Sequence, residues 1–331
     1  MNCYYPLPSF FNRRIKLTMS IIRAWSALAV LSSAVFCAKS FAVGDLLISK
    51  IMQSDFIFDR NISNIPFIPI GYLQYTDQDD ITLENHCVDD INCQFNYKNF
   101  AQGFGLPVYV DKKYMIIIGE TLESNHVKTA YDSYRIDTVG ILAAVVAQPN
   151  IDWQVGAFYY GYRGMGGDHD FNQPSESIMG AVGRYRHSAR FHSYWGAITY
   201  NTIDERIVLP YIGFDWFINK EWSIGGVMPW PAIAYAPTQN NVIKLGGFVN
   251  GAEWQLPDEN NFSSQAVDVD FGQVNLGLAY EHRLHNNFWG EFMIGHSGFG
   301  AVSFSESSLS MDNDIDGAPF IRFSLLYRPE S

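Results

Sequence analysis

Five charged side chains lie within or beside apolar, strand-like segments, where a charge needs an explanation. They are Asp215, Lys244, Glu281, Glu291 and Arg322. An ionised group that leaves bulk water is stable only when it is paired or hydrated. The five residues therefore predict one of two interiors: a structural network of ion pairs, or a hydrated lumen whose walls they line.

Serine and histidine are adjacent at three places, which raises the question of a hydrolytic site. The pairs are His187-Ser188, His192-Ser193 and His296-Ser297. Neighbours on a strand point to opposite faces, whereas a nucleophile and its base must share one face. A pair on a single strand therefore cannot act, and a lipid hydrolase built across neighbouring strands is the last of the functions considered.

The acidic segment 312–317 copies the opening of a calcium-binding loop. Asp312, Asp314 and Asp316 supply oxygens at alternate positions, and Gly317 follows where the chain must turn sharply. Phe323 stands where such a loop needs a bidentate glutamate. A solvated acidic loop is the preferred alternative, and no metal or other cofactor is expected.

The mature chain is expected to carry one pair of cysteines. Cys87 and Cys93 lie close together in the polar stretch 84–93. In an oxidising compartment such a pair most simply forms a local disulfide. A zinc site that also uses His86 is the alternative, but zinc sites prefer tighter cysteine spacing and a fourth ligand.

The elements that must position these groups are strands. From residue 99 to 327, runs of about ten residues rich in aromatic and β-branched side chains alternate with polar connections. Short turns are expected at 110–113, 148–151, 188–190, 219–221, 238–241 and 284–287, and longer loops at 125–132, 163–174, 257–264 and 300–316. Lipid offers the backbone no hydrogen-bond partner, so such a chain crosses a membrane only as a closed barrel.

Alternation within the last strands assigns their inner and outer faces. In one strand Phe288, Gly290, Phe292 and Ile294 face one way, and Trp289, Glu291 and Met293 face the other. The final strand places Arg322 and Ser324 on the inner side. A soluble β-sandwich also alternates, but it does not explain the export signal described below or the aromatic content of 15%.

The number of strands has two solutions. Twelve strands are expected from residue 99 onward. Dividing residues 222–235 at the prolines 229 and 231, and adding residues 45–58 as a first strand, gives fourteen. The expected organisation is a signal peptide at 1–42, an N-terminal strand with a disulfide-bearing loop at 43–98, and the barrel at 99–331.

Residues 1–42 have the composition of an export signal. Basic residues precede an apolar run at 24–36, and Ser40 and Ala42 are small residues where a signal peptidase reads. The run is shorter than the ~20 residues of a spanning helix. We expect cleavage after Ala42, with Met19 as the better translational start.

Charge excludes some partners. Removing the leader with its five basic residues changes the net charge from −12 to −17. Such a balance argues against nucleic acid and against docking onto anionic lipid surfaces.

Four short segments carry a resemblance to a known family. Residues 209–216, 219–223, 229–231 and 234–235 read LPYIGFDW, NKEWS, PWP and AY. From about residue 95 to the C-terminus the chain resembles a bacterial family of outer-membrane β-barrels, the domain of unknown function 6268. The resemblance implies fold and location and no activity. Members of the wider class end in an aromatic residue, whereas here four residues follow Tyr327.

The sequence thus predicts a monomeric, transmembrane antiparallel β-barrel of twelve or fourteen strands in the outer membrane of a Gram-negative bacterium. The expected partners are outer-membrane lipid, the assembly machinery and an unidentified small solute. A pore or binding channel for small solutes is the first function, and a non-transporting structural or surface-interaction barrel is the alternative. An enzyme is not expected.

Overall fold

The computed structural model describes residues 56, 62–66, 68–83, 94–129, 133–165, 175–201, 206–227, 230–257, 266–306 and 309–328. None of these residues belongs to a helix long and apolar enough to cross a membrane.

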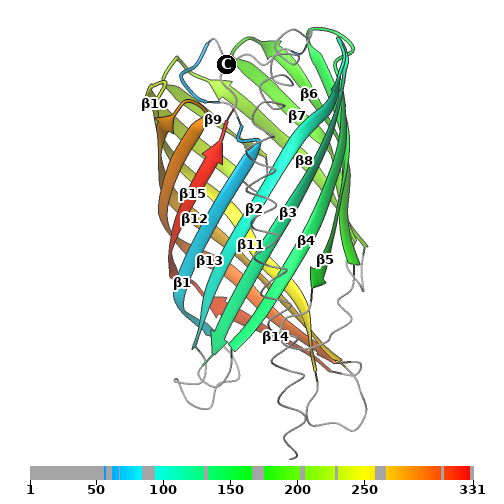
Figure 1. Cartoon of the computed structure of the whole chain (residues 1–331), viewed down its shortest axis with the longest axis vertical. Coiled ribbons are helices and arrows are strands. Elements are labelled where there is room, and N and C mark those ends of the chain that lie inside the picture. The colour runs from blue at the N-terminus through cyan, green and yellow to red at the C-terminus, as the bar shows by residue number, and fades with distance from the viewer. Residues whose placement is uncertain are drawn as a thin grey trace, which may run out of the picture. The chain divides into compact units, whose positions relative to one another are not determined.

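Strands make up the regular structure of the described residues (Figure 1). In chain order they are β1 (Gly71–Leu83), β2 (Gln94–Val110), β3 (Tyr114–Thr129), β4 (Ser133–Ala147), β5 (Trp153–Met165), β6 (Ser175–Ser188), β7 (Phe191–Asn201), β8 (Arg206–Phe217), β9 (Trp222–Val227), β10 (Trp230–Thr238), β11 (Asn241–Pro257), β12 (Ala266–His285), β13 (Phe288–Glu306), β14 (Leu309–Asp316) and β15 (Pro319–Tyr327).

The strands form one closed antiparallel barrel. From β1 to β13 each strand pairs with its neighbours in sequence, and β1 closes the ring by pairing with β14 and β15. β14 and β15 both lie between β13 and β1, so they are two halves of one interrupted strand. The Ser297 hydroxyl accepts the Ala318 N–H at 2.9 Å at this interruption. The fifteen strands of the described residues therefore occupy fourteen positions, which confirms the larger of the two expected strand counts.

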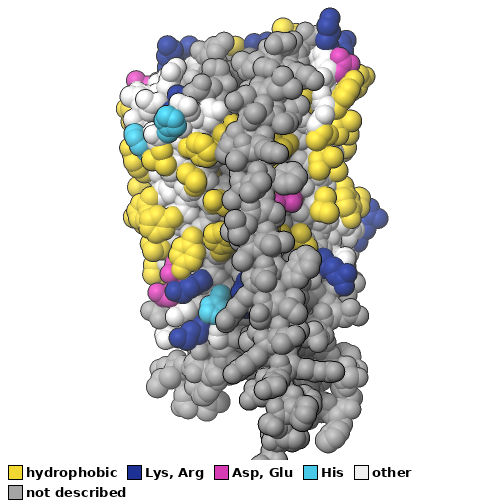
Figure 2. Space-filling view, viewed as in Figure 1, with side chains coloured by type: hydrophobic (Ala, Val, Ile, Leu, Met, Phe, Trp, Pro, Cys, Tyr) yellow, Lys and Arg dark blue, Asp and Glu magenta, His cyan; other side chains and the backbone are white. Residues whose placement is uncertain are grey.

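The outer face explains why these residues form strands. Side chains alternate between the two faces, and the outward set is mainly apolar, with exposed residues such as Ile141, Leu276 and Phe323. On the face shown in Figure 2, hydrophobic side chains gather in a band, with Lys and Arg toward its two ends. Aromatic residues near the short turns include Tyr114, Trp216 and Trp222. This is the pattern of a barrel that lies in lipid.

All six short turns expected from the sequence are confirmed, and they lie at one end of the barrel. Side chains fix several of them. Asn150 accepts the backbone N–H groups of Asp152 and Trp153, both at 3.0 Å. Asn219 does the same at the turn between β8 and β9. The described C-terminus is at this end too, because the Arg328 N–H donates to the carbonyl of Asn287 at 2.8 Å.

Two expectations about the strands are wrong. The segments 125–132 and 300–316 were expected to be loops, but β3 continues to Thr129, β13 continues to Glu306, and β14 occupies Leu309–Asp316. Ladder hydrogen bonds continue beyond the apolar part of a strand, so hydropathy underestimates its length.

The barrel also begins before residue 99, because β1 is Gly71–Leu83. Of the segment 45–58 proposed as the first strand, only Phe56 is described, and it is not in a strand.

One flank of the interior is filled by contacts across the ring. Inward side chains of β1 and β2 reach those of β11 and β12 over β13 and β15. The rings of Tyr97 and Phe271 lie 5.3 Å apart, and Gln273 donates to Gln78 at 2.5 Å. The Tyr97 hydroxyl also donates to Asn250 at 3.3 Å. The inward faces of β1, β2, β11, β12, β13 and β15 form what we call the packed flank.

The closing seam can be tested by crosslinking. In the β1–β15 register Tyr75 faces Phe323. We expect the double variant Tyr75→Cys, Phe323→Cys, in a background without the native cysteines, to form a disulfide on mild oxidation, because directly opposed residues are within reach. The control pairs Phe100→Cys with Phe323→Cys, which lie two strands or about 10 Å apart. Oxidation of the control, or failure of the first pair, would show that the seam is elsewhere. Loss of thiol labelling is the measurement.

Candidate functional site

Four of the five charged residues noted in the sequence meet inside the barrel. Lys244 lies on β11, Glu281 on β12, Glu291 on β13 and Arg322 on β15. Glu281 and Glu291 are directly opposite each other in the register of β12 and β13. Like charges in that position repel, so the arrangement requires cations between them.

Three basic side chains hold the two carboxylates. The Lys244 ammonium contacts Glu281 and lies 3.4 Å from Glu291. Arg322 donates to Glu291 at 3.1 Å, and Arg328 donates to Glu281 at 2.8 Å. We call these five residues the charge cluster. It carries three positive and two negative charges and links four strands to the segment after β15.

The surroundings of the charge cluster are mainly apolar. Glu281 has no exposed surface. The Arg322 guanidinium lies 4.4 Å above the Phe248 ring, and that of Arg328 lies 5.5 Å from the Trp289 ring. The two carboxylates and Arg328 therefore depend on their partners rather than on water, whereas Lys244 keeps about a third of its side chain exposed. The cluster fixes the relative positions of the strands that carry it.

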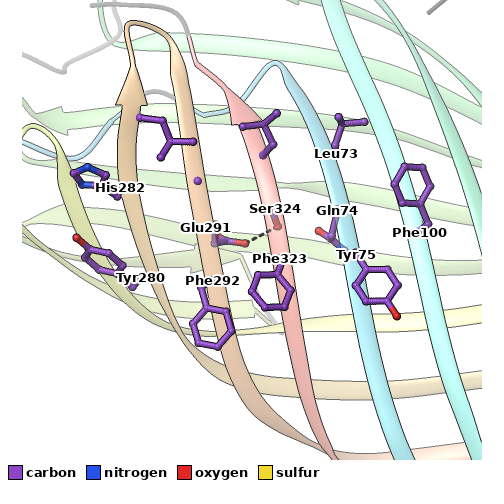
Figure 3. Close-up of a pocket in the computed structure, with 13 residues that line it drawn as sticks. Leu73, Gln74, Tyr75, Phe100, Tyr280, His282, Glu291, Phe292, Phe323 and Ser324 are labelled. Carbon is purple, nitrogen blue, oxygen red and sulfur yellow. Dashed lines mark hydrogen bonds between the residues drawn. The ribbon is translucent and has the colours of Figure 1, made fainter. Parts of the chain in front are cut away.

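Figure 3 shows the alternation that separates this interior from the outer face. Glu291 and Ser324 lie on one side of the sheet, joined by a hydrogen bond of 3.0 Å, while Phe292 and Phe323 point to the other side. A groove of about 490 Å³ on this outer side is lined mainly by outward apolar side chains. It belongs to the lipid-facing surface and not to the interior.

A second polar group lies on the wall made by β3 to β8, which we call the lumen wall. Thr121 on β3 and Tyr160 on β5 share a hydrogen bond of 2.6 Å between their hydroxyls. The Tyr162 ring stacks on Tyr160 with centroids 5.4 Å apart. Tyr162 also donates to Glu176 on β6 and is 2.6 Å from the Tyr200 hydroxyl on β7. We call these five residues the tyrosine band.

Asp215 lies on the lumen wall and not in the charge cluster. It is on β8, where the Tyr194 hydroxyl donates to it at 2.5 Å. Its neighbours Phe214 and Trp216 are exposed on the outer face, so Asp215 points inward. The sequence singled out Asp215 but gave no indication of its distance from the other four residues.

The remaining sequence candidates have different outcomes. Cys87 and Cys93 are outside the described residues, so their disulfide stays a prediction.

Asp314 and Asp316 are exposed on strand β14, and the Asp312 side chain is not described. The calcium-loop interpretation is wrong in its geometry, because an extended strand cannot wrap its oxygens around one ion. The described residues contain no group of three or more His, Cys, Asp or Glu side chains suited to a metal.

Serine and histidine do meet across strands. His187 on β6 lies 2.9 Å from the Ser193 hydroxyl on β7, and His126 lies 2.6 Å from Ser133. Both contacts are exposed. Within the described ranges no carboxylate is hydrogen-bonded to either imidazole, so these pairs lack the third group that orients a hydrolytic base.

Two features of the polar interior were not predicted from the sequence. Arg328 was overlooked because it follows the last strand, where a lumen residue was not expected. The tyrosine band was overlooked because its members are far apart in the chain. A sequence pattern that could have revealed this band is present in β5, where the aromatic residues Phe158, Tyr160 and Tyr162 recur at every second position.

Comparisons with known proteins find only solved structures of low similarity. No family model and no curated protein matches the chain, so the family resemblance stays a prediction. Among solved structures, a FadL homologue from Pseudomonas aeruginosa shares 10% identity over 78% of this chain and 90% of that one, with a TM-score of 0.47. The translocator domain of the autotransporter NalP from Neisseria meningitidis shares 10% identity over 91% and 99%, with a TM-score of 0.34. The TodX monoaromatic hydrocarbon channel shares 7% over 80% and 91%, with a TM-score of 0.40. At these scores the similarity does not identify a function.

Removing one buried carboxylate should destabilise the barrel. Glu281→Ala leaves Lys244 and Arg328 beside a site that has lost its negative charge. We expect a loss of about 3–5 kcal/mol, as for other broken buried pairs, seen as a lower temperature of the heat-modified shift in gel mobility. The control Glu221→Ala, in an exposed turn, should change stability by less than ~0.5 kcal/mol. Equal melting of both variants would contradict the pairing.

Proposed function

We propose that this protein is an outer-membrane channel for small polar solutes, with its path along the lumen wall. The proposal is supported by the closed barrel, its lipid-facing apolar band and the export signal expected at residues 1–42. The outer membrane of a Gram-negative bacterium is the location that accommodates all three.

One observation carries the proposal: β8 has solvent-exposed residues on its inward face, in the part of the strand that lies beyond its pairing with β9. On β8 the residues 206–210 are exposed on both faces, with Ile207 at 40%, Val208 at 61% and Leu209 at 53%. Ile207 and Leu209 share the inward face with Asp215. On the packed flank, by contrast, inward residues such as Phe271 and Met293 are buried. This exposure supports a path for a solute beside this part of the lumen wall.

The chemistry of the lumen wall suits polar solutes. The tyrosine band presents hydroxyl groups on partly exposed side chains, beside the buried carboxylate of Glu176, so a hydrated solute can exchange its water hydrogen bonds for those of the hydroxyl groups. The net charge of −17 expected after removal of the leader favours cations over anions in such a path.

A non-transporting barrel is the alternative that the packed flank favours. In that case the space beside β8 would not continue through the barrel. Single-channel recording separates the two functions, because only a continuous path conducts.

We expect discrete conductance steps from the refolded protein in planar bilayers, with a reversal potential in a KCl gradient that indicates preference for K⁺. Leu209→Trp should lower the height of the conductance step, because it adds bulk on the inward face of β8. Val208→Trp is the matched control, because it adds the same bulk to the outer face. The absence of conductance steps from correctly folded protein would contradict the channel. An equal reduction of the conductance step by the two variants would contradict the path beside β8.

A further inference from the structure

We propose that the barrel interior holds a binding site for a small organic cation, formed by the Glu123 carboxylate between the rings of Tyr72 and Tyr160. The inference deepens the proposed function, since it names a class of solute for the same lumen. It rests on three features of β1 to β5: two ring positions set by glycines, one carboxylate without a partner, and one ring fixed by hydrogen bonding.

Two glycines bring the rings toward β3. In the sheet register Thr121 on β3 lies between Gly103 on β2 and Gly140 on β4. A Cβ at Gly103 would come within 2.7 Å of the Tyr72 ring, and one at Gly140 would come within 2.5 Å of the Tyr160 ring. Each ring therefore lies over a glycine, and the two approach β3 from opposite sides.

The carboxylate is on the same strand and the same face. Glu123 is two residues beyond Thr121 and pairs with Ala101 and Thr138, whose small side chains leave room beside it. In the part of the chain that is described, no hydrogen bond or ion pair reaches Glu123. Tyr72 and Tyr160 both lie within electrostatic range of this carboxylate and of each other. All three side chains are half-buried, and the Tyr72 ring also packs against the buried cluster that includes Trp289 and Leu326, so the site lies where the packed flank meets the lumen wall.

One ring is held in place before any ligand arrives. The Tyr160 hydroxyl is fixed by Thr121 at 2.6 Å, and its ring stacks on Tyr162. A ring held in this way loses little freedom when it binds a ligand, which favours affinity.

The chemistry selects the ligand class. A carboxylate without a partner attracts a positive charge, and aromatic faces attract a cation that is weakly hydrated. An anion would be repelled by Glu123, and a neutral apolar ligand would leave the carboxylate unpaired. A divalent metal prefers several oxygen ligands, whereas this site offers one carboxylate and two rings. The charge cluster differs, because its carboxylates already have three cations.

The test is calorimetric titration of choline into the full-length protein refolded in a non-ionic maltoside. The neutral probe 3,3-dimethylbutan-1-ol has the same shape without the charge. We expect choline to bind and the alcohol not to bind. Glu123→Gln, which keeps the size of the side chain, should weaken choline binding by about tenfold or more, and Tyr72→Leu should weaken it several-fold.

Glu120→Gln is the matched control, because Glu120 lies on the same strand and faces outward, opposite Phe104 and Ile141. It should leave choline binding unchanged. Heat-modified gel mobility establishes that each variant is folded, and Tyr72→Leu keeps the test available if Glu123→Gln does not fold. The inference is overturned if wild-type protein does not bind choline, if the alcohol binds equally, or if Glu123→Gln binds as wild type does. Choline binding by a barrel that is silent in bilayers would contradict the channel but not the site.

Discussion

The structure depends on one constraint: a peptide group in hydrocarbon must find its hydrogen-bond partner within the protein. In this chain the constraint is met by closing the sheet, with β1 against β14 and β15. The apolar outer face, the polar inner face and the position of every inward side chain follow from that closure. A shift of one residue at the seam would exchange the two faces of β1 and bring Leu73 and Tyr75 inside.

The closed sheet leaves an interior with two unlike walls. On the packed flank, side chains meet across the ring, and the charge cluster holds four strands and the C-terminal segment together. Buried ion pairs are costly to desolvate, so their contribution is to fix geometry rather than to add net stability. On the lumen wall, inward side chains such as Tyr160, Tyr162 and Tyr211 keep part of their surface exposed, and the tyrosine band provides hydrogen-bonding groups in a continuous row. A rigid flank opposite an open wall is the arrangement on which the proposed path depends.

Sequence reasoning recovered what local pattern determines. Turn residues such as Asn150 and Asn219 marked the short connections, and period-two alternation placed Glu281, Glu291 and Arg322 on one inner face. It failed where the determining contacts are not local. Thr121 and Tyr160 meet across β4 only because residue 140 is glycine, and Arg328 joins the charge cluster from beyond the last strand. The polar ends of β3 and β13 were assigned to loops because hydropathy reflects side-chain polarity and does not report the backbone hydrogen bonds between strands.

The central claim is that water reaches the lumen wall and not the packed flank. Single cysteines placed in a background without native cysteines, in protein refolded into lipid vesicles, test it with a water-soluble thiol reagent. Tyr211→Cys on the lumen wall should react fast, whereas Met293→Cys on the packed flank and the lipid-facing control Ile212→Cys should react slowly. Equal rates at positions 211 and 293 would show that the two walls do not differ, and would contradict the account.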